Sequence, residues 1–156
     1  MERTITLLLV LATVLAGLIA GFFYTWSFTV IQSLNLTDAS TASSAMNSIN
    51  SNIRTAWFAA IFFGAPALIT LSLIVKLIHN KQNMFWVLSA FVFAICTLII
   101  TFTQHIPLNN ELANGLEWSQ YYPEWISWNH ERMCTSVLAF ISMLLSIIFH
   151  VSNRIR

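Results

Sequence analysis

The chain has 156 residues, of which 57% are hydrophobic and only 8% are charged, and its formal net charge is +1. Its mean hydropathy is +0.72, which excludes a disordered chain and is unusual for a soluble protein. The small net charge and the lack of a basic run argue against nucleic-acid binding. Four stretches contain no Asp, Glu, Lys or Arg, and they run 4–37, 55–75, 82–110 and 133–153.

Each of these stretches is at least as long as the roughly 20 apolar residues with which a helix crosses about 30 Å of hydrocarbon. We therefore predict an all-α integral membrane protein, with residues 1–156 forming a single transmembrane domain. The expected fold is a four-transmembrane-helix bundle with short amphipathic helices in its two outer loops. The predicted spans are about 5–33, 55–78, 84–103 and 129–152.

The first span resembles a signal peptide because Arg3 precedes an apolar run with small residues. However, the run continues without a charge through Trp26, whereas a signal sequence usually has an apolar core of only about 7–15 residues. We expect it to be retained as a helix. Gly17 and Gly21 lie four residues apart, a spacing that lets membrane helices approach closely.

Asp38 opens the first outer loop and is a favourable N-cap for a short helix. Ala42, Met46, Ile49 and Ile53 follow at intervals of three or four residues, which places one apolar stripe on that helix. The remaining positions are mostly Ser and Asn. We expect this amphipathic helix to lie at the outer mouth of the bundle.

Prolines and aromatic residues mark the rest of the chain. Pro66 should remove a backbone hydrogen bond within the second span and kink it. A tight inner loop is expected at 79–83, and an aromatic-rich outer loop should follow the third span. Pro123 should end any helix that begins before it, so a new helix is predicted from about Glu124.

The orientation follows from the distribution of Lys and Arg, which concentrate in cytoplasmic loops. Five such residues fall on one side of the predicted bundle: Arg3, Lys76, Lys81, Arg154 and Arg156. Arg54 and Arg132 fall on the other. We therefore expect a multi-pass protein of the cell membrane with both termini in the cytoplasm.

Polar groups that could carry chemistry gather near the predicted outer ends of the helices. Trp125, Asn129 and Arg132 are spaced at i, i+4 and i+7, so they share one helix face. A buried guanidinium needs partners, and asparagines and Glu131 are candidates. The competing interpretation is that Arg132 extends to the membrane interface.

Histidines offer two weaker alternatives. His105 and His130 could bind a metal with Glu131 as a third ligand, although no spacing supports the set. His79 and His150 could ligate haem across the bundle, but they more simply mark the inner interface. Cys96 and Cys134 lie inside apolar stretches and indicate packing rather than a disulfide.

Several segments in order resemble the anthrone-oxygenase-like family of small membrane proteins. The segments begin with Gly21–Ser27 and Ala45–Asn50, and continue with Phe62–Pro66, Ile106–Leu112 and the pattern Trp125-x-x-x-Asn129-x-x-Arg132. The resemblance implies a four-helix membrane bundle and, in characterised members, oxidation of a tricyclic anthrone to an anthraquinone by molecular oxygen. It does not firmly imply a cofactor.

The resemblance also implies a set of functional positions, namely Trp26, Asn50, Asn109, Asn129 and Arg132. Relatives often carry His at the position of Asn129. His130 is no direct substitute, because a one-residue shift turns a side chain by about 100° on a helix. His105 precedes the Pro-x-Asn segment and could be a functional residue specific to this chain.

Two functions are compatible with these residues. In the first, the protein oxidises an apolar aromatic substrate: His105 acts as the base, and Arg132, Asn109 and Asn129 stabilise developing negative charge. The substrate would bind at residues drawn from the outer ends of the helices, with Trp26, Asn50, Trp125 and Trp128 around it. In the second, the protein binds a lipid or another hydrophobic molecule, or serves as an accessory subunit of a membrane complex, without catalysis.

Overall fold

The computed structural model describes residues 2–79 and 84–155, and these residues are almost entirely helical. The elements are α1 (Glu2–Thr25), η1 (Trp26–Val30), α2 (Ile31–Asn35), α3 (Ala39–Asn52), α4 (Ala56–His79), α5 (Met84–Ile100), η2 (Thr101–His105), α6 (Ile106–Ala113) and α7 (Trp118–Ile155). The elements η1 and η2 are single π turns. Most of the tight loop predicted at 79–83 lies outside the described residues.

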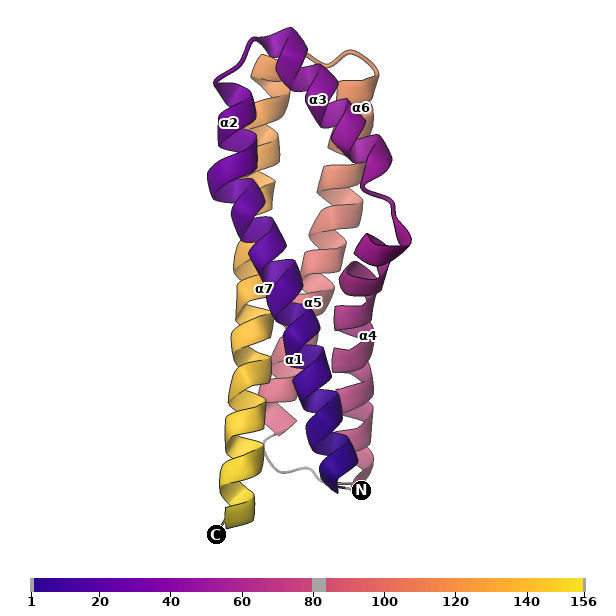
Figure 1. The fold of residues 1–156 in the computed structure, drawn as a ribbon, viewed down its shortest axis with the longest axis vertical. Coiled ribbons are helices and arrows are strands. Elements are labelled where there is room, and N and C mark those ends of the chain that lie inside the picture. Colours follow the sequence, from indigo (N-terminus) through magenta and orange to yellow (C-terminus); the bar gives the residue numbers. More distant parts are fainter. Residues whose placement is uncertain (1, 80–83, 156) are drawn as a thin grey trace.

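Apart from α3, these elements form four columns that run along one bundle (Figure 1). The first column joins α1, η1 and α2, and the third joins α5, η2 and α6, while α4 and α7 form the other two. Each column contains a helix long and apolar enough to cross a membrane. The predicted all-α four-helix bundle is confirmed, and the chain is a multi-pass membrane protein. The start of α1 and the end of α7 lie at the same end of the bundle.

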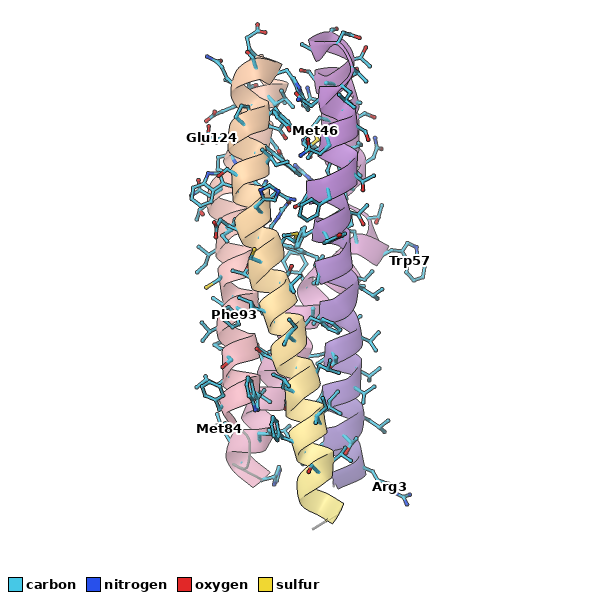
Figure 2. All side chains as sticks on the ribbon, turned by 90° about the vertical axis from the view of Figure 1, so that its left-hand side faces the viewer. Arg3, Met46, Trp57, Met84, Phe93 and Glu124 are labelled. Carbon is cyan, nitrogen blue, oxygen red and sulfur yellow. The ribbon has the colours of Figure 1, made fainter. Side chains whose placement is uncertain are left out.

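Small and apolar side chains fill the lower core, while large apolar side chains face outward. Leu9, Ala12, Val87 and Ala90 are fully buried. By contrast, Trp57 is 85% exposed and projects away from the bundle (Figure 2). An outward apolar surface of this kind is stable in hydrocarbon, where the protein gains nothing by hiding it.

Gly17 allows α1 and α7 to approach closely. A Cβ atom at this position would lie 3.1 Å from the Phe140 ring, which is tighter than ordinary van der Waals contact. At Gly21 a Cβ atom would meet nothing within 4 Å. The prediction that both glycines aid helix packing therefore holds for Gly17 but not for Gly21, because only Gly17 makes a close contact.

The third column is longer than the predicted span of 84–103. It continues through η2 and α6 to Ala113 without a break. The Ile106 N–H donates to the Thr101 carbonyl, five residues back, which widens this turn immediately before Pro107. Because a proline ring crowds the carbonyl four residues before it, the wider turn accommodates Pro107 within a continuous helix.

The C-terminal end of α6 is fixed by Gly115, which has φ of 102°. The Gly115 N–H donates to the Leu112 carbonyl at 3.1 Å, and the Leu116 N–H donates to the Glu111 carbonyl at 3.0 Å. This pair of bonds is the Schellman motif, in which glycine adopts the left-handed conformation at low cost. The chain therefore turns sharply and enters α7 at Trp118, after two more residues.

The prediction that Pro123 ends a helix is wrong. The last helix begins at Trp118 and passes through Pro123. Pro123 lies in the second turn, so the helix loses only the bond to the Ser119 carbonyl, and Ser119 is exposed. Two side chains of this first part also hold it against α2: Trp118 Nε1 donates to Asn35 at 3.0 Å, and the Tyr122 hydroxyl donates to Gln32 at 2.9 Å.

The helix α3 closes the end of the bundle opposite the termini, crossing it obliquely (Figure 1). Asp38 is its N-cap, as predicted, and accepts a hydrogen bond from the Thr41 N–H at 2.9 Å. On the predicted apolar stripe, Ala42 and Met46 are buried, and Ile49 and Ile53 are half-buried. The helix therefore covers the bundle with its apolar face.

In the second column, α4 runs continuously through Pro66, and the kink expected there stays a prediction. Lys76, which was counted among the charges of the inner side although it falls within the predicted second span, is only 1% exposed, and His150 and Ser146 are also buried near this end of the bundle. Polar side chains thus occur inside both ends of the bundle.

The two glycines of α1 give a matched test of packing. We expect Gly17→Val to lower the stability of the bundle by about 1–3 kcal/mol, the usual cost of overpacking a tight contact, because the added methyl groups collide with Phe140. Gly21→Val adds the same atoms where there is space and should change stability far less. Thermal unfolding in detergent compares the two, and equal effects would contradict this account of Gly17.

The N-cap of α3 gives a pH-dependent prediction. Hydrogen bonds from Thr41, through its side chain and then its backbone, hold the pKa of Asp38 below its usual 3.8. The cap should therefore be complete above that pH and be lost as the pH falls through the lowered value. NMR titration of the Thr41 amide should show this transition. Asp38→Asn should abolish it while keeping α3 capped, and an unchanged titration would contradict the assignment.

Candidate functional site

The two π turns lie on the first and third columns, which face each other across the bundle beside the same cavity. In η1 the Ile31 N–H donates to the Trp26 carbonyl, and in η2 the Ile106 N–H donates to the Thr101 carbonyl. Single π turns are often found at functional sites, because the extra residue changes the direction of the side chains. Here they supply Trp26, Thr101 and His105 to the cavity wall.

The main cavity has a volume of about 480 Å³ and lies among α1, η1, α3, α4, η2, α6 and α7. This volume is within the range of about 300–1,000 Å³ that is usual for sites of small organic ligands. Most of its wall is apolar, with a high share of aromatic rings: Phe22, Phe23, Trp26, Phe58, Phe62, Phe63, Phe102 and Trp125. A flat, apolar ring system is the kind of ligand that such a wall favours.

Arg132 brings a positive charge to this apolar cavity. Its side chain is only 7% exposed. Its Nη2 and Nε atoms donate to the Asn129 side-chain oxygen at 2.6 and 3.2 Å, and Nη1 lies 3.5 Å from the Thr101 hydroxyl. The guanidinium carbon lies 4.1 Å from the centre of the Phe23 ring and 5.8 Å from that of Trp125. The interpretation that Arg132 extends to the membrane interface is therefore wrong.

Asn129 orients this guanidinium from the same helix. It is fully buried, and its amide nitrogen donates to the Ser27 hydroxyl at 2.7 Å and to the Phe23 carbonyl at 3.3 Å. These two bonds direct the side-chain oxygen toward Arg132. As their spacing predicted, Trp125, Asn129 and Arg132 lie on one buried face of α7.

No carboxylate compensates the charge of Arg132 among the described side chains. Asp38, Glu111, Glu117, Glu124 and Glu131 are all exposed. Amide and hydroxyl oxygens and two aromatic faces surround the guanidinium instead. A buried charge costs several kcal/mol when its partner is missing, so the cavity provides an environment that attracts an anionic group of a ligand.

His105 brings an imidazole to the same cavity. It is 1% exposed, and its ring meets Trp125 edge to face with the centroids 5.0 Å apart. The Trp128 carbonyl lies near the imidazole, although neither ring nitrogen forms a well-aligned hydrogen bond with a described residue. Because buried polar atoms are usually paired, the ring nitrogen that does not approach Trp128 is available to a ligand.

A chain of hydrogen bonds ties three helices together above the cavity. The buried Tyr121 hydroxyl on α7 donates to the Asn109 oxygen on α6 at 2.7 Å. The Asn109 amide then donates to the Asn50 oxygen on α3 at 3.2 Å. Asn50 keeps a buried amide nitrogen that lacks a partner among the described residues. This chain fixes α3 over the cavity and leaves a donor at its end.

The structure brings together most of the residues predicted for a site. Those that line the main cavity are Trp26, Asn50, His105, Asn109, Trp125 and Arg132. Asn129 supports Arg132 from behind. Trp128 was predicted among the substrate-binding residues, but it is not part of the lining and only its backbone approaches His105.

The alternative metal site is not assembled. His130 packs against Phe28, with ring centroids 5.7 Å apart, and Glu131 is exposed. The residues that the structure describes contain no group of three His, Cys, Asp or Glu side chains able to hold a metal ion. His105, His130 and Glu131 therefore do not form such a group.

Several residues of the site were not predicted from the sequence. Tyr121 belongs to the segment expected to form an aromatic-rich outer loop, but it is fully buried and bonded to Asn109. Ser27 is fully buried behind Asn129, and Phe62 forms part of the wall. The i, i+4 spacing that links Tyr121 to Trp125 could have revealed the first of these, because it extends the buried face of α7 by one turn.

Comparison with known proteins bears on this arrangement. The model of a family described as anthrone oxygenase matches residues 54–142, which is more than half of the chain. The chain belongs to the anthrone oxygenase family. No curated protein and no solved structure matches it. The stretch that matches the anthrone oxygenase model contains His105, Asn109, Asn129 and Arg132, whereas Trp26 and α3 lie before it.

The positive charge of Arg132, which no described carboxylate compensates, can be tested by its effect on thermal stability. Arg132→Met replaces the guanidinium with an apolar side chain of similar length and should leave the thermal stability unchanged or raise it, as is common when buried charges are removed. Asn129→Leu leaves the cation without its main acceptor and should cost at least about 1–3 kcal/mol. A marked loss of stability in Arg132→Met would show that the charge serves the fold rather than a ligand.

Proposed function

We propose that this protein oxidises an apolar aromatic, anthrone-like substrate with molecular oxygen inside the main cavity. One observation carries the proposal: a buried guanidinium without a carboxylate partner among the described residues and a buried imidazole without a well-formed hydrogen bond line the same aromatic cavity. Membership of the anthrone oxygenase family supports this type of reaction. The ring system lies against the aromatic wall, and its oxygen substituents face the polar groups.

In the first step, His105 removes a proton from the acidic ring carbon opposite the carbonyl group. The electron pair of the broken C–H bond moves into the ring system, so that the carbonyl oxygen becomes an enolate oxygen. Arg132 donates hydrogen bonds to this oxygen and stabilises its charge, as donors do in oxyanion sites. Asn129 is a positioning residue, because it directs the guanidinium without meeting the substrate.

In the second step, the carbanion reacts with dioxygen. Transfer of one electron to O₂ and recombination of the two radicals form a C–O bond, and a proton converts the peroxide anion into a hydroperoxide. Loss of the second proton from the same carbon breaks the O–O bond, and the leaving hydroxide takes a proton to become water. The sum is one anthrone and one O₂ giving one anthraquinone and one water.

The hydrogen-bond chain above the cavity holds the substrate in place. Asn109 and Asn50 provide amide groups at the end near α3, where they can meet a phenolic hydroxyl or a second carbonyl of the substrate. Their position keeps α3 closed over the ring system and so limits access of water to the reactive anion.

We further propose that the protein lies in the cell membrane with both termini in the cytoplasm, so that the main cavity lies near the outer surface. The excess of Lys and Arg beside the predicted inner ends of the helices supports this orientation. The alternative function, binding of a hydrophobic molecule without reaction, uses the same cavity and is separated from catalysis by the assay below.

The two histidines at this end of the bundle give a matched pair for the assay. Purified protein should consume oxygen with an anthrone substrate and release the quinone. His105→Ala should lower kcat by roughly 100-fold or more, the usual contribution of a general base, whereas His130→Ala, whose ring packs on Phe28 outside the cavity lining, should retain activity.

Equal activity of the wild-type protein and His105→Ala would remove His105 from the reaction. Binding of the anthrone without oxygen uptake by the wild-type protein would favour the non-catalytic function instead. Quinone absorbance measured alongside oxygen consumption distinguishes these outcomes, because the background reaction of the anthrone with oxygen is measured without protein.

A further inference from the structure

A second, much smaller cavity lies deeper in the bundle. Its volume is about 20 Å³, and side chains of α1, α4, α5 and α7 line it. Four of them are alanines, namely Ala16, Ala65, Ala94 and Ala139. Phe62 lines both this small cavity and the main cavity, so one aromatic ring separates the two spaces.

The wall of the small cavity has few groups that could form hydrogen bonds with a water molecule. Its only hydroxyl groups belong to Thr97 and Ser136. The Thr97 hydroxyl lies 3.0 Å from the Phe93 carbonyl and 2.9 Å from the Thr135 hydroxyl. The Ser136 hydroxyl donates to the Met133 carbonyl at 2.8 Å. A buried water needs two to four polar partners, and apolar cavities instead remain dry and accept apolar guests such as xenon.

The size of the cavity restricts its guest. A volume of about 20 Å³ for water-sized probes slightly exceeds the roughly 10–15 Å³ that one water molecule requires. An alkyl chain or a ring does not fit beside Phe62 in its present position, whereas a diatomic molecule does. The guest is therefore small and apolar.

The cavity is also close to lipid on one side. Pro66 on α4 and Leu98 on α5 are half-buried members of its wall, so they face both the cavity and the outer surface of the bundle. Dioxygen is apolar and dissolves better in hydrocarbon than in water. Passage between these two helices gives it a short path from the bilayer to Phe62.

We infer that the small cavity is a binding site for dioxygen, from which O₂ passes Phe62 into the main cavity. The inference rests on the proposed function for its reaction, but the presence of a site for a small apolar gas does not depend on catalysis. In this inference Ala65 and Ala139 form part of the wall of the oxygen site. Phe62 separates the bound oxygen from the ring system of the substrate in the main cavity.

Dissolved O₂ is paramagnetic and gives a direct test that needs no substrate. We expect O₂ under pressure to increase the NMR relaxation of the methyl groups of Ala16, Ala65, Ala94 and Ala139 in the wild-type protein in nanodiscs. Ala20, one turn from Ala16 and equally buried, is outside the cavity and should show a markedly smaller effect. Equal effects at Ala16 and Ala20 would overturn the inference.

A matched pair of variants tests the route to the reaction. Ala65→Val fills the cavity, whereas Ala90→Val adds the same atoms at a fully buried position outside both cavities. Ala65→Val should raise the KM for O₂ several-fold and leave the KM for the anthrone unchanged, and Ala90→Val should change neither. Thermal unfolding of both variants controls for the cost of overpacking.

The outcomes separate this inference from the proposed function. Enhanced relaxation at the four alanines in a protein that oxidises no anthrone would keep the gas site and reject the reaction. Oxidation by a protein whose alanines show no enhancement would keep the reaction and reject the site. An unchanged KM for O₂ in Ala65→Val, with the relaxation effect abolished, would reject the role of the cavity in delivery.

Discussion

The rest of the site depends on how the buried guanidinium of Arg132 is stabilised. Charge is expensive in a structure surrounded by hydrocarbon, and intramembrane ionisable groups usually have a functional reason. Here the charge is held by the oxygen of Asn129 and by the face of Phe23, which stabilise it only in part. Since the described carboxylates are all exposed, the proposed function assigns the role of the missing partner to an anionic ligand.

Hydrocarbon also dictates how such a cavity can be built. Irregular backbone is not tolerated where lipid surrounds it, because unpaired amide groups find no water there. The protein instead widens two continuous helices by one π turn each, at Trp26–Val30 and Thr101–His105. The main cavity opens beside these turns, and the amphipathic α3 closes it from the end of the bundle. The first and third columns thus remain continuous helices beside the cavity.

The fold could be predicted well because the strongest pattern in the sequence, its long uncharged stretches, shows that the helices are surrounded by hydrocarbon. Long stretches without charge specify four spans whatever their packing, and the i, i+4, i+7 spacing placed Trp125, Asn129 and Arg132 on one face. Pro107 and Pro123 were harder to interpret, because a proline's effect depends on its place in the helix. In the structure a π turn accommodates Pro107, and Pro123 lies close enough to the start of α7 to cost one bond.

Which polar residues meet one another could not be derived from local patterns. The bonds from Tyr121 to Asn109 and from Asn109 to Asn50 join three helices, and they depend on how far η2 turns α6. The rotation of the helices relative to one another also places His105 in the cavity, whereas His130 packs on Phe28. Periodicity gives the face of one helix, but the rotation of neighbouring helices decides which faces meet.

The most direct measurement of the central claim is a structure of the protein in lipid nanodiscs with the phenolate form of a hydroxyanthraquinone bound, because this anion resembles the product. The account predicts that the ring system lies in the main cavity against Phe23 and Trp125, with a ligand oxygen within hydrogen-bonding distance of the Arg132 guanidinium. A ligand bound outside this cavity, or bound inside it with Arg132 still directed only at Asn129 and Thr101, would contradict the account.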